Sequence, residues 1–467
     1  MAAAAVLVPS LLLAACGSAD STEAGGAASG APSPTGPADS PSAAASPDGG
    51  PWPEPEGEAT EAAASSPRLA VTHADGIVVL DAMTLETVED FELDGFTRVN
   101  AAGDGRHVMV TTTGGFAVLD TGTWARPHGD HDHYWTAAPR LSEVMYPAEE
   151  PGHVVAHGGR TVLFDDGTGQ VVALDSADVA DPAADRLEIS TGEAHHGVAV
   201  ELSDGSVLVT EGTEDARSTV RVLDAAGTEV ARTDDCPGVH GEATAADEAV
   251  VVGCEDGVVV WAGGALTKVA APDAYGRIGN QRGTHGSPFV LGDYTSDPDA
   301  ELERPTRVSV IDTRSASLRL VDLPASYSFR SLGRGDAGEA LVLGTDGALH
   351  VIDPETATLT RSVPVVAAWE EPEDWQEPRP TLLVHDGTAY VTEPATSELH
   401  AVDLATGEVW ASVTLGVVPD EITAASGEAE AGSEALSDEE AGDEAHEDHE
   451  DAGHEDEPSD GPSAGDA

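Results

Sequence analysis

Hydrophobic and polar residues alternate along most of the chain with a period of two. Stretches such as "VELSDGSVLVT" and "LVHDGTAYVT" place two alternating runs on either side of a short polar turn. This alternation is typical of half-buried β-strands, and turns that contain Gly and Asp join antiparallel neighbours. We find no long segment with the 3.6-residue period of an amphipathic helix. The pattern therefore predicts an all-β protein.

A short motif recurs through this region: a strand that ends in an aliphatic residue followed by aspartate. A degenerate copy, "VVVWA" (258–262), fills the one gap in the series formed by Asp81, Asp120, Asp175, Asp224, Asp312, Asp353 and Asp403. The spacing is that of a four-stranded β-propeller blade with variable loops. We therefore expect eight blades, or seven if the degenerate copy is not a full blade. The first blade lacks an innermost strand, which "PDEIT" (419–423) is expected to supply, closing the ring.

Composition divides the chain into four parts. Residues 1–16 form an apolar run that is too short to cross a bilayer and resembles a bacterial lipoprotein signal ending at Cys16, the predicted lipidation site; ordinary secretion is the alternative. Residues 17–66 have the composition of a disordered tether, 67–423 form the propeller, and 424–467 are an acidic tail. We therefore expect an extracytoplasmic, membrane-anchored protein.

The chain is strongly acidic, with a formal net charge of −65 and Lys268 as its one lysine. Nucleic acid and anionic membrane surfaces repel such a protein, whereas cations are attracted to it. After Cys16, only Cys236 and Cys254 remain. In an exported protein two cysteines favour a disulfide over a thiolate metal site.

Histidines fall at matching positions of consecutive blades. When the hairpin turns are used as landmarks, the innermost strands of three blades begin near His153, at His195 and His196, and at His240. His285, in "THGSPF", takes a similar position in the next blade. Because innermost strands all start from one face of a propeller, these imidazoles are predicted to meet at one mouth of the central channel. Converging imidazoles favour a metal site, although any one of them alone is more simply a hydrogen-bonding residue.

Further candidate ligands lie outside these strand starts. The segment "PHGDHDHYW" (127–135) adds His128, His131 and His133, with Asp130 and Asp132 as ligands or as groups that orient an imidazole. His157 lies about 13 Å from His153 along the same strand, so it is either structural or part of a weaker second site. The tail contributes His446, His449 and His454.

The two cysteines flank one of these strand starts. Cys236 lies in the loop that leads to His240, and Cys254 ends the return strand of the same hairpin. A disulfide between them would hold that loop, so we expect it to preorganise His240 for metal binding.

The segments "PHGDHDHYW", "AHHGVAVEL" and "CPGVHGEATA", in this order, carry a family resemblance. From Pro67 to Gly416 the chain resembles the AztD zinc metallochaperones. The resemblance implies a non-enzymatic β-propeller outside the cytoplasmic membrane that binds Zn²⁺ and passes it to the solute-binding protein of a zinc ABC transporter. Members of this family can carry a His-rich segment near the N-terminus, whereas here the C-terminal tail is the candidate for first capture.

Other functions remain open on the residues alone. Imidazole ligands suit Ni²⁺ and Cu²⁺ as well as Zn²⁺. A three-histidine site with an open position can also activate water, so a propeller enzyme with a catalytic metal is one alternative. A metal-free interaction scaffold is the other, because the fold by itself does not decide function.

Overall fold

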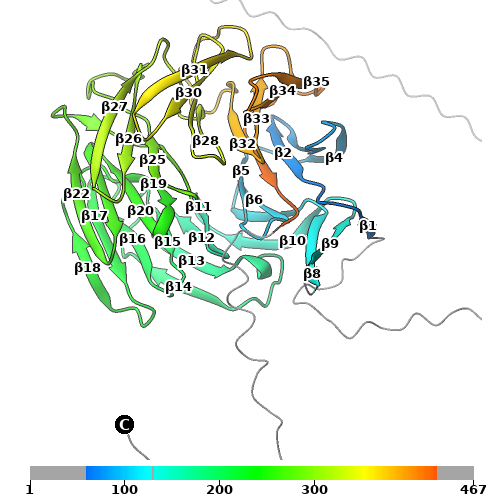
Figure 1. Cartoon of the computed structure of the whole chain (residues 1–467). Helices are drawn as coiled ribbons and strands as arrows, with labels where there is room; N and C mark the ends of the chain where they lie inside the picture. Colours follow the sequence, from blue (N-terminus) through cyan, green and yellow to red (C-terminus); the bar gives the residue numbers. More distant parts are fainter. Residues whose placement is uncertain (1–58, 129–130, 429–467) are drawn as a thin grey trace, which may run out of the picture. The chain divides into compact units, whose positions relative to one another are not determined.

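The computed structural model describes residues 59–128 and 131–428 (Figure 1). The predicted signal, most of the tether and the tail, with Cys16, His446, His449 and His454, lie outside the described residues, as does Asp130. No helix in the described part is long and apolar enough to cross a membrane. Its only helical segments are two single 3₁₀ turns, η1 (Ser176–Asp178) and η2 (Ala246–Glu248).

The first half of the described chain forms four antiparallel sheets of the ring in sequence order, and a separate three-stranded sheet. The first contains β2 (Arg68–His73), β3 (Gly76–Asp81) and β4 (Thr87–Glu92), and the second β5 (Arg98–Ala101), β6 (His107–Thr112), β7 (Gly115–Asp120) and β10 (Arg140–Pro147). The third contains β11 (Pro151–His157), β12 (Arg160–Asp165), β13 (Gln170–Asp175) and β14 (Arg186–Ser190). The fourth contains β15 (Ala199–Glu201), β16 (Val207–Gly212), β17 (Arg217–Leu223) and β18 (Glu229–Thr233).

The second half continues with four more sheets. The fifth contains β19 (His240–Ala245), β20 (Ala249–Cys254), β21 (Asp256–Ala262) and β22 (Ala265–Ala270), with the short β23 (Gly276–Arg277) beside β21. The sixth contains β24 (Gln281–Thr284), β25 (Ser287–Gly292), β26 (Arg307–Asp312) and β27 (Ser317–Asp322). The seventh contains β28 (Leu332–Arg334), β29 (Ala340–Leu343), β30 (Ala348–Asp353) and β31 (Thr358–Pro364), and the eighth β32 (Leu382–His385), β33 (Thr388–Glu393), β34 (Glu398–Asp403) and β35 (Val409–Thr414). The degenerate motif "VVVWA" is thus part of β21, within a full sheet.

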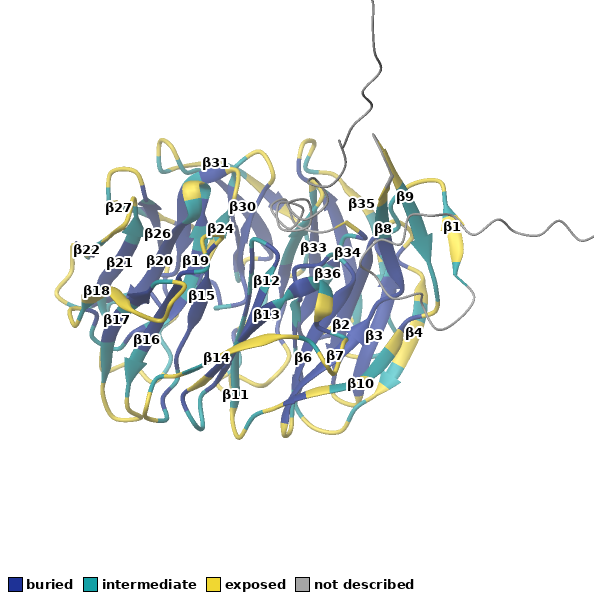
Figure 2. Cartoon of the chain, turned by 90° about the horizontal axis from the view of Figure 1, so that it is seen from below, coloured by how far each residue is buried: buried dark blue, intermediate teal, exposed yellow. Residues whose placement is uncertain are grey.

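The sheets stand around a central channel, so the protein is a β-propeller (Figure 1). Innermost strands of neighbouring sheets contact one another from β24 through β28, β32 and β36 to β5, β11 and β15. Buried apolar clusters fill the space between sheets; one of them joins Phe164, Val200 and Val250 from three successive sheets. Figure 2 shows this distribution, with buried strands and exposed loop ends.

The ring closes through the end of the described chain. Strand β36 (Ile422–Ala425) pairs antiparallel with β2, Ile422 opposite Val71 and Thr423 opposite Ala70. The sequence around Pro419–Thr423 therefore does supply the missing innermost strand, which begins three residues later than the motif itself. This strand pairing joins the first and last parts of the propeller.

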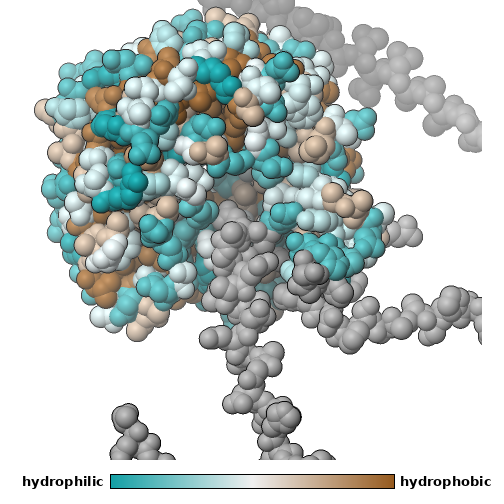
Figure 3. Space-filling view, viewed as in Figure 1, coloured by the Kyte–Doolittle hydropathy of each residue, from teal (hydrophilic) through white to brown (hydrophobic). Residues whose placement is uncertain are grey.

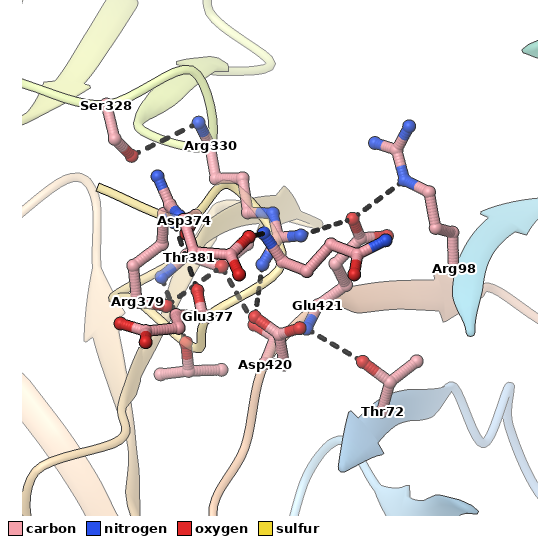
Figure 4. A network of polar contacts seen from close by, with 12 residues as sticks. Thr72, Arg98, Ser328, Arg330, Asp374, Glu377, Arg379, Thr381, Asp420 and Glu421 are labelled. Atoms are coloured by element: carbon pink, nitrogen blue, oxygen red, sulfur yellow. Dashed lines mark hydrogen bonds and ion pairs between the residues drawn. The ribbon is translucent and has the colours of Figure 1, made fainter. Parts of the chain in front are cut away.

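A buried charge network reinforces the closure (Figure 4). Arg330 pairs with Asp420 and, at 2.9 Å, with Glu421, while Arg98 reaches the same Glu421 oxygen at 2.8 Å. Burial raises the pKa of Asp420, whereas the Arg330 guanidinium opposes that rise. The network thereby joins the closing strand to two other sheets.

The repeated aspartate has a local structural cause. At the end of each such strand its carboxylate accepts hydrogen bonds from the next turn; Asp403, for example, accepts from the Thr406 amide at 2.7 Å and from its hydroxyl at 2.9 Å. The Thr406 backbone N–H and then its hydroxyl lower the pKa of Asp403. The motif is therefore a turn-forming device, because aspartate mimics a backbone acceptor.

Candidate metal centre

Three histidines from three consecutive sheets meet at one mouth of the channel. His153 lies on β11, His196 precedes β15, and His240 begins β19. The ring centroids are 4.9 Å apart for His153 and His196, 4.6 Å for His196 and His240, and 6.1 Å for His153 and His240. Residues separated by more than 40 positions in the sequence are thus in contact in the fold.

Irregular strand geometry aims two of these rings. The register between β11 and β12 shifts between Pro151 and Val154, on either side of His153. The register between β19 and β20 shifts between His240 and Glu242, where Gly241 has a φ of +67°. A side chain at Gly241 would also come 2.3 Å from the Gly279 carbonyl oxygen, so glycine is required there. β-Bulges of this kind re-aim side chains and are frequent next to functional sites.

Two of the imidazoles form a hydrogen bond through Nδ1, and the third lies close to a carboxylate. His196 Nδ1 lies 2.6 Å from Asp166 Oδ2, and His240 Nδ1 lies 2.7 Å from the Gly279 carbonyl oxygen. His153 Nδ1 lies 3.2 Å from Glu242 Oε2. Carbonyl and carboxylate oxygens only accept, so in the neutral forms of His196 and His240 Nδ1 is the donor and Nε2 carries the lone pair. This is the arrangement in which outer groups orient metal-binding histidines.

The free nitrogens then face one another. His153 Nε2 and His196 Nε2 are 3.2 Å apart. If both Nδ1 atoms are protonated, two lone pairs meet at this distance and repel. A shared cation relieves that repulsion, which makes the point between the rings a natural position for a metal ion.

Electrostatics keep one ring neutral. Burial lowers the pKa of His240 well below its usual value, and His196, Arg277 and His153 lower it further. At neutral pH His240 therefore offers a lone pair without first losing a proton, because metal binding requires the neutral imidazole.

The three rings open onto a cavity of about 870 Å³, which also contacts Glu242, Arg277 and Arg282. The molecular face seen in Figure 3 is hollowed near the middle of the ring. A volume of this size is within the usual range for small-molecule sites. The cluster is thus reachable by small solutes.

The neighbouring His195 faces elsewhere. Its ring packs edge-on against Phe164, with centroids 5.2 Å apart, and its Nδ1 lies 2.9 Å from the Glu193 carbonyl oxygen. The side chain is buried. Of the His195–His196 pair, only His196 therefore joins the cluster.

His285 does not occupy the expected position, and that prediction is wrong. It lies in the turn between β24 and β25, at the far end of the hairpin from where β24 begins. There it stacks on His157, with ring centroids 5.2 Å apart, and His157 Nε2 lies 3.3 Å from Glu248 Oε1. The inner strand of this sheet is short, so its hairpin turn comes earlier in the sequence than the spacing of the other blades predicts. His157 and His285 form a pair of their own.

The segment 127–135 lies apart from the cluster. It belongs to a three-stranded sheet of β1 (Thr60–Ala62), β9 (His131–Thr136) and β8 (Thr123–His128). Figures 1 and 2 both place β8 and β9 at the outer edge, away from β11, β15 and β19. His131 and His133 contact each other, and His133 Nδ1 lies 2.7 Å from Glu61 Oε1, while Asp132 is exposed.

The predicted disulfide is confirmed. Cys236 and Cys254 are bonded, with a Cα–Cα distance of 4.9 Å. The bridge links the loop before His240 to the end of β20. It is buried, and it fixes the loop next to one ring of the cluster.

Sequence reasoning missed the groups that orient the rings. Asp166 follows a strand-ending aspartate in "FDDGTG", and Glu242 stands two residues after His240. The second position carried a signal, because residues two apart on a strand share a face. Asp166 and the Gly279 carbonyl oxygen come from other hairpins, and no local pattern marks them.

Glu393, Glu398 and His400 form a separate group whose possible ligand atoms lie within 4.8 Å of one another. Both nitrogens of His400 are already engaged, Nδ1 with Ser412 at 2.8 Å and Nε2 with Glu393 at 3.1 Å. The preceding sheet repeats this arrangement: His350 contacts Ser362 and Asp346. We therefore interpret the group as a repeated structural hydrogen bond.

Fold and site together define a β-propeller with three converging imidazoles at one channel mouth. No protein-family model matches the sequence. The chain resembles the "Zinc chaperone AztD" of Citrobacter koseri, with 26% identity over 365 residues that cover 75% of this chain and 83% of the relative. The crystal structure of C. koseri AztD superposes with a TM-score of 0.67 at 25% identity and covers 77% of this chain and 98% of that one. Apo AztD from the same organism has the same TM-score at 23% identity, with the same coverage, and supports the fold.

Proposed function

We propose that this protein is a zinc chaperone that works outside the cytoplasmic membrane. His153, His196 and His240 hold the ion through their Nε2 atoms. Asp166, Glu242 and the Gly279 carbonyl oxygen orient the rings. Support comes from the resemblance to a protein named zinc chaperone and from the geometry of the three rings.

The observation that carries the proposal is the 3.2 Å separation of the two Nε2 atoms of His153 and His196. A merely structural histidine pair would place a donor against an acceptor. Here His196 Nδ1 is hydrogen-bonded to Asp166 and His153 Nδ1 lies 3.2 Å from Glu242, so we infer that both Nε2 atoms are acceptors. Three imidazoles and one exchangeable ligand suit tetrahedral zinc.

We further propose that the ion is delivered to the solute-binding protein of a zinc ABC transporter. The rings lie at the channel mouth, so an incoming protein can replace them one at a time. The histidines of 127–135 and of the tail would collect zinc weakly before it reaches the channel. A lipid on Cys16 would hold the protein at the outer side of the cell membrane.

Zinc binding is tested by metal analysis and chelator competition on untagged full-length protein. We expect tight zinc retention, and His153→Ala, His196→Ala and His240→Ala should each weaken it at least about tenfold, because each removes one ligand. His385→Asn is the matched control, since this partly buried histidine lies on the innermost strand of another sheet. Unchanged affinity in all three alanine variants would leave the proposal without a site.

Delivery is tested by mixing zinc-loaded protein with an apo solute-binding protein in the presence of a competing chelator. Direct transfer predicts that zinc appears in the acceptor while the chelator stays empty. A screen of the zinc-loaded protein for hydrolase and redox activity addresses the enzymatic alternative. Appearance of the ion in the chelator first would mean release into solution.

A further inference from the structure

Four arginines line the cavity beside the three histidines, and they fall into two pairs. Arg98 and Arg330 are neutralised by carboxylates, Glu421 for both and Asp420 for the second. Within 59–128 and 131–428, Arg277 and Arg282 form no ion pair with a carboxylate. The one polar contact of the Arg282 guanidinium is the carbonyl oxygen of Gln281, at 2.8 Å. In so acidic a chain, two guanidinium groups in one cavity that form no ion pair among the described residues require an explanation.

Arg277 lies directly beside the histidine cluster. Its guanidinium covers Gly279, because a methyl group added at Gly279 would come 2.3 Å from Arg277 Nη1. The carbonyl oxygen of the same Gly279 holds His240 Nδ1 at 2.7 Å. The Arg277 guanidinium therefore lies next to Gly279, the residue whose carbonyl oxygen orients the proposed ligand His240.

Arg282 lines the same cavity. Its side chain projects from β24 and is exposed to the solvent of the channel. Desolvation inside the channel lowers the pKa of Arg282, and the negative charge of Glu242 opposes this shift. Glu242 itself lies 3.2 Å from His153. Arg282 and the three histidines therefore line the same cavity.

Two acidic residues that line the cavity, Asp293 and Glu303, already accept hydrogen bonds from neighbouring loops. Asp293 accepts from the Gly279 amide at 2.6 Å and from Asn280 Nδ2 at 2.7 Å. Glu303 accepts from the amides of Ser296 and Asp297. These two carboxylates hold loops in place through hydrogen bonds. The guanidinium N–H groups of Arg277 and Arg282 remain available to bind an anion. The cavity therefore combines an open metal position with free donors for an anion.

We propose that the cavity binds a small polycarboxylate together with the metal. This proposal rests on the proposed function and specifies the form in which the metal is held. One carboxylate of the ligand takes the coordination position that three histidines leave open. A second carboxylate accepts hydrogen bonds from Arg277 and Arg282, the fork geometry that arginine offers to carboxylates. The cavity of about 870 Å³ has room for such a molecule.

The test uses citrate as the probe and full-length, zinc-loaded protein. Isothermal titration calorimetry should show citrate binding, while metal analysis after gel filtration should show that zinc stays with the protein. Arg277→Gln and Arg282→Gln should each weaken citrate binding at least about tenfold, the loss expected for a charge-assisted hydrogen bond. Arg314→Gln is the matched control, because Arg314 is an exposed arginine paired with Asp312.

The outcomes separate this proposal from the one on which it rests. Without citrate, both arginine variants should still bind zinc, because neither arginine is a proposed metal ligand. If zinc binds but citrate binding is absent, or is equal in all four proteins, the carboxylate proposal is wrong and zinc binding stands. Extraction of zinc by citrate without a ternary complex would also overturn it. If zinc itself does not bind, both proposals fail together.

The same titration distinguishes two sources of the carboxylate, a small molecule and the acidic tail of this chain. The acidic tail of this chain carries the same chemical groups as citrate. If an added peptide with the sequence of residues 441–457 binds through Arg277 and Arg282 and citrate does not, a small-molecule ligand is ruled out.

Discussion

The Nε2 atoms of His153 and His196 lie 3.2 Å apart although 43 residues separate them in the sequence. A carboxylate lies at Nδ1 of each ring, Asp166 at His196 and Glu242 at His153, and orients the ring so that Nε2 points to the other histidine. The pair is built by two different sheets, so its spacing depends on how those sheets pack. We therefore expect that replacing a group that contacts Nδ1 affects metal binding as strongly as replacing a group on the Nε2 side.

Removing a group behind a ring should weaken zinc binding while the fold stays intact. Asp166→Asn keeps the size of the side chain but removes its charge, so His196 is held less firmly and is a weaker base. We expect a loss of about 10- to 100-fold in zinc affinity. Chelator competition measures it, with the turn residue Asp224→Asn as control. Equal affinities in both variants would mean that Asp166 has no part in the site.

Zinc affinity should fall below about pH 6, because protons compete with the ion for the imidazole nitrogens. Affinity measured at pH 7.5, 6.5 and 5.5 tests this. A flat profile would rule out histidine as the ligand.

The stability of the metal-free protein should also fall with pH. The pKa of His240 is lower in the folded state than its usual value, so the unfolded chain binds its proton first. The corresponding stability is present above about pH 6.5 and is lost as the pH falls below it. Urea unfolding of wild type and His240→Asn at pH 7.5 and 5.5 measures this, and the variant should lose less stability over that interval.

The disulfide should matter for binding as well as for stability. A loop with a sequence separation of 18 residues is closed by the Cys236–Cys254 bridge. Replacing both cysteines by alanine should cost about 3 kcal/mol in the free energy of unfolding. If the bridge preorganises His240, zinc affinity should fall too under conditions in which the double variant is folded. Retained affinity in a folded double variant would make the bridge purely structural.

Breaking the buried charge network should destabilise the closure of the ring. Arg330→Ala leaves the buried Asp420 without its ion-pair partner and leaves Glu421 paired with Arg98 alone. We expect a loss of about 3–5 kcal/mol, the usual cost of removing one partner of a buried pair. Arg314→Ala, which breaks an exposed pair with Asp312, should cost less than about 1 kcal/mol. Denaturant unfolding of the two variants gives the comparison.

Much of the architecture could be predicted from local patterns. Alternation and the recurrent aspartate predict strands and turns, since both depend on neighbours within a few residues. The same patterns located the starts of β11, β15 and β19 closely enough to bring three histidines together. They also predicted the disulfide and the closing strand.

The sequence by itself determined the repeat, the strand order and the histidine-bearing ends of three inner strands. Only the tertiary structure decided that His196 rather than His195 joins the cluster, that His285 turns away, and that Asp166, Glu242 and Gly279 orient the rings. The physical reason is that a bulge or a shortened hairpin redirects a side chain without changing the alternation around it. Contacts between separate sheets depend on how the sheets pack, and the two-residue alternation along a strand does not predict that packing.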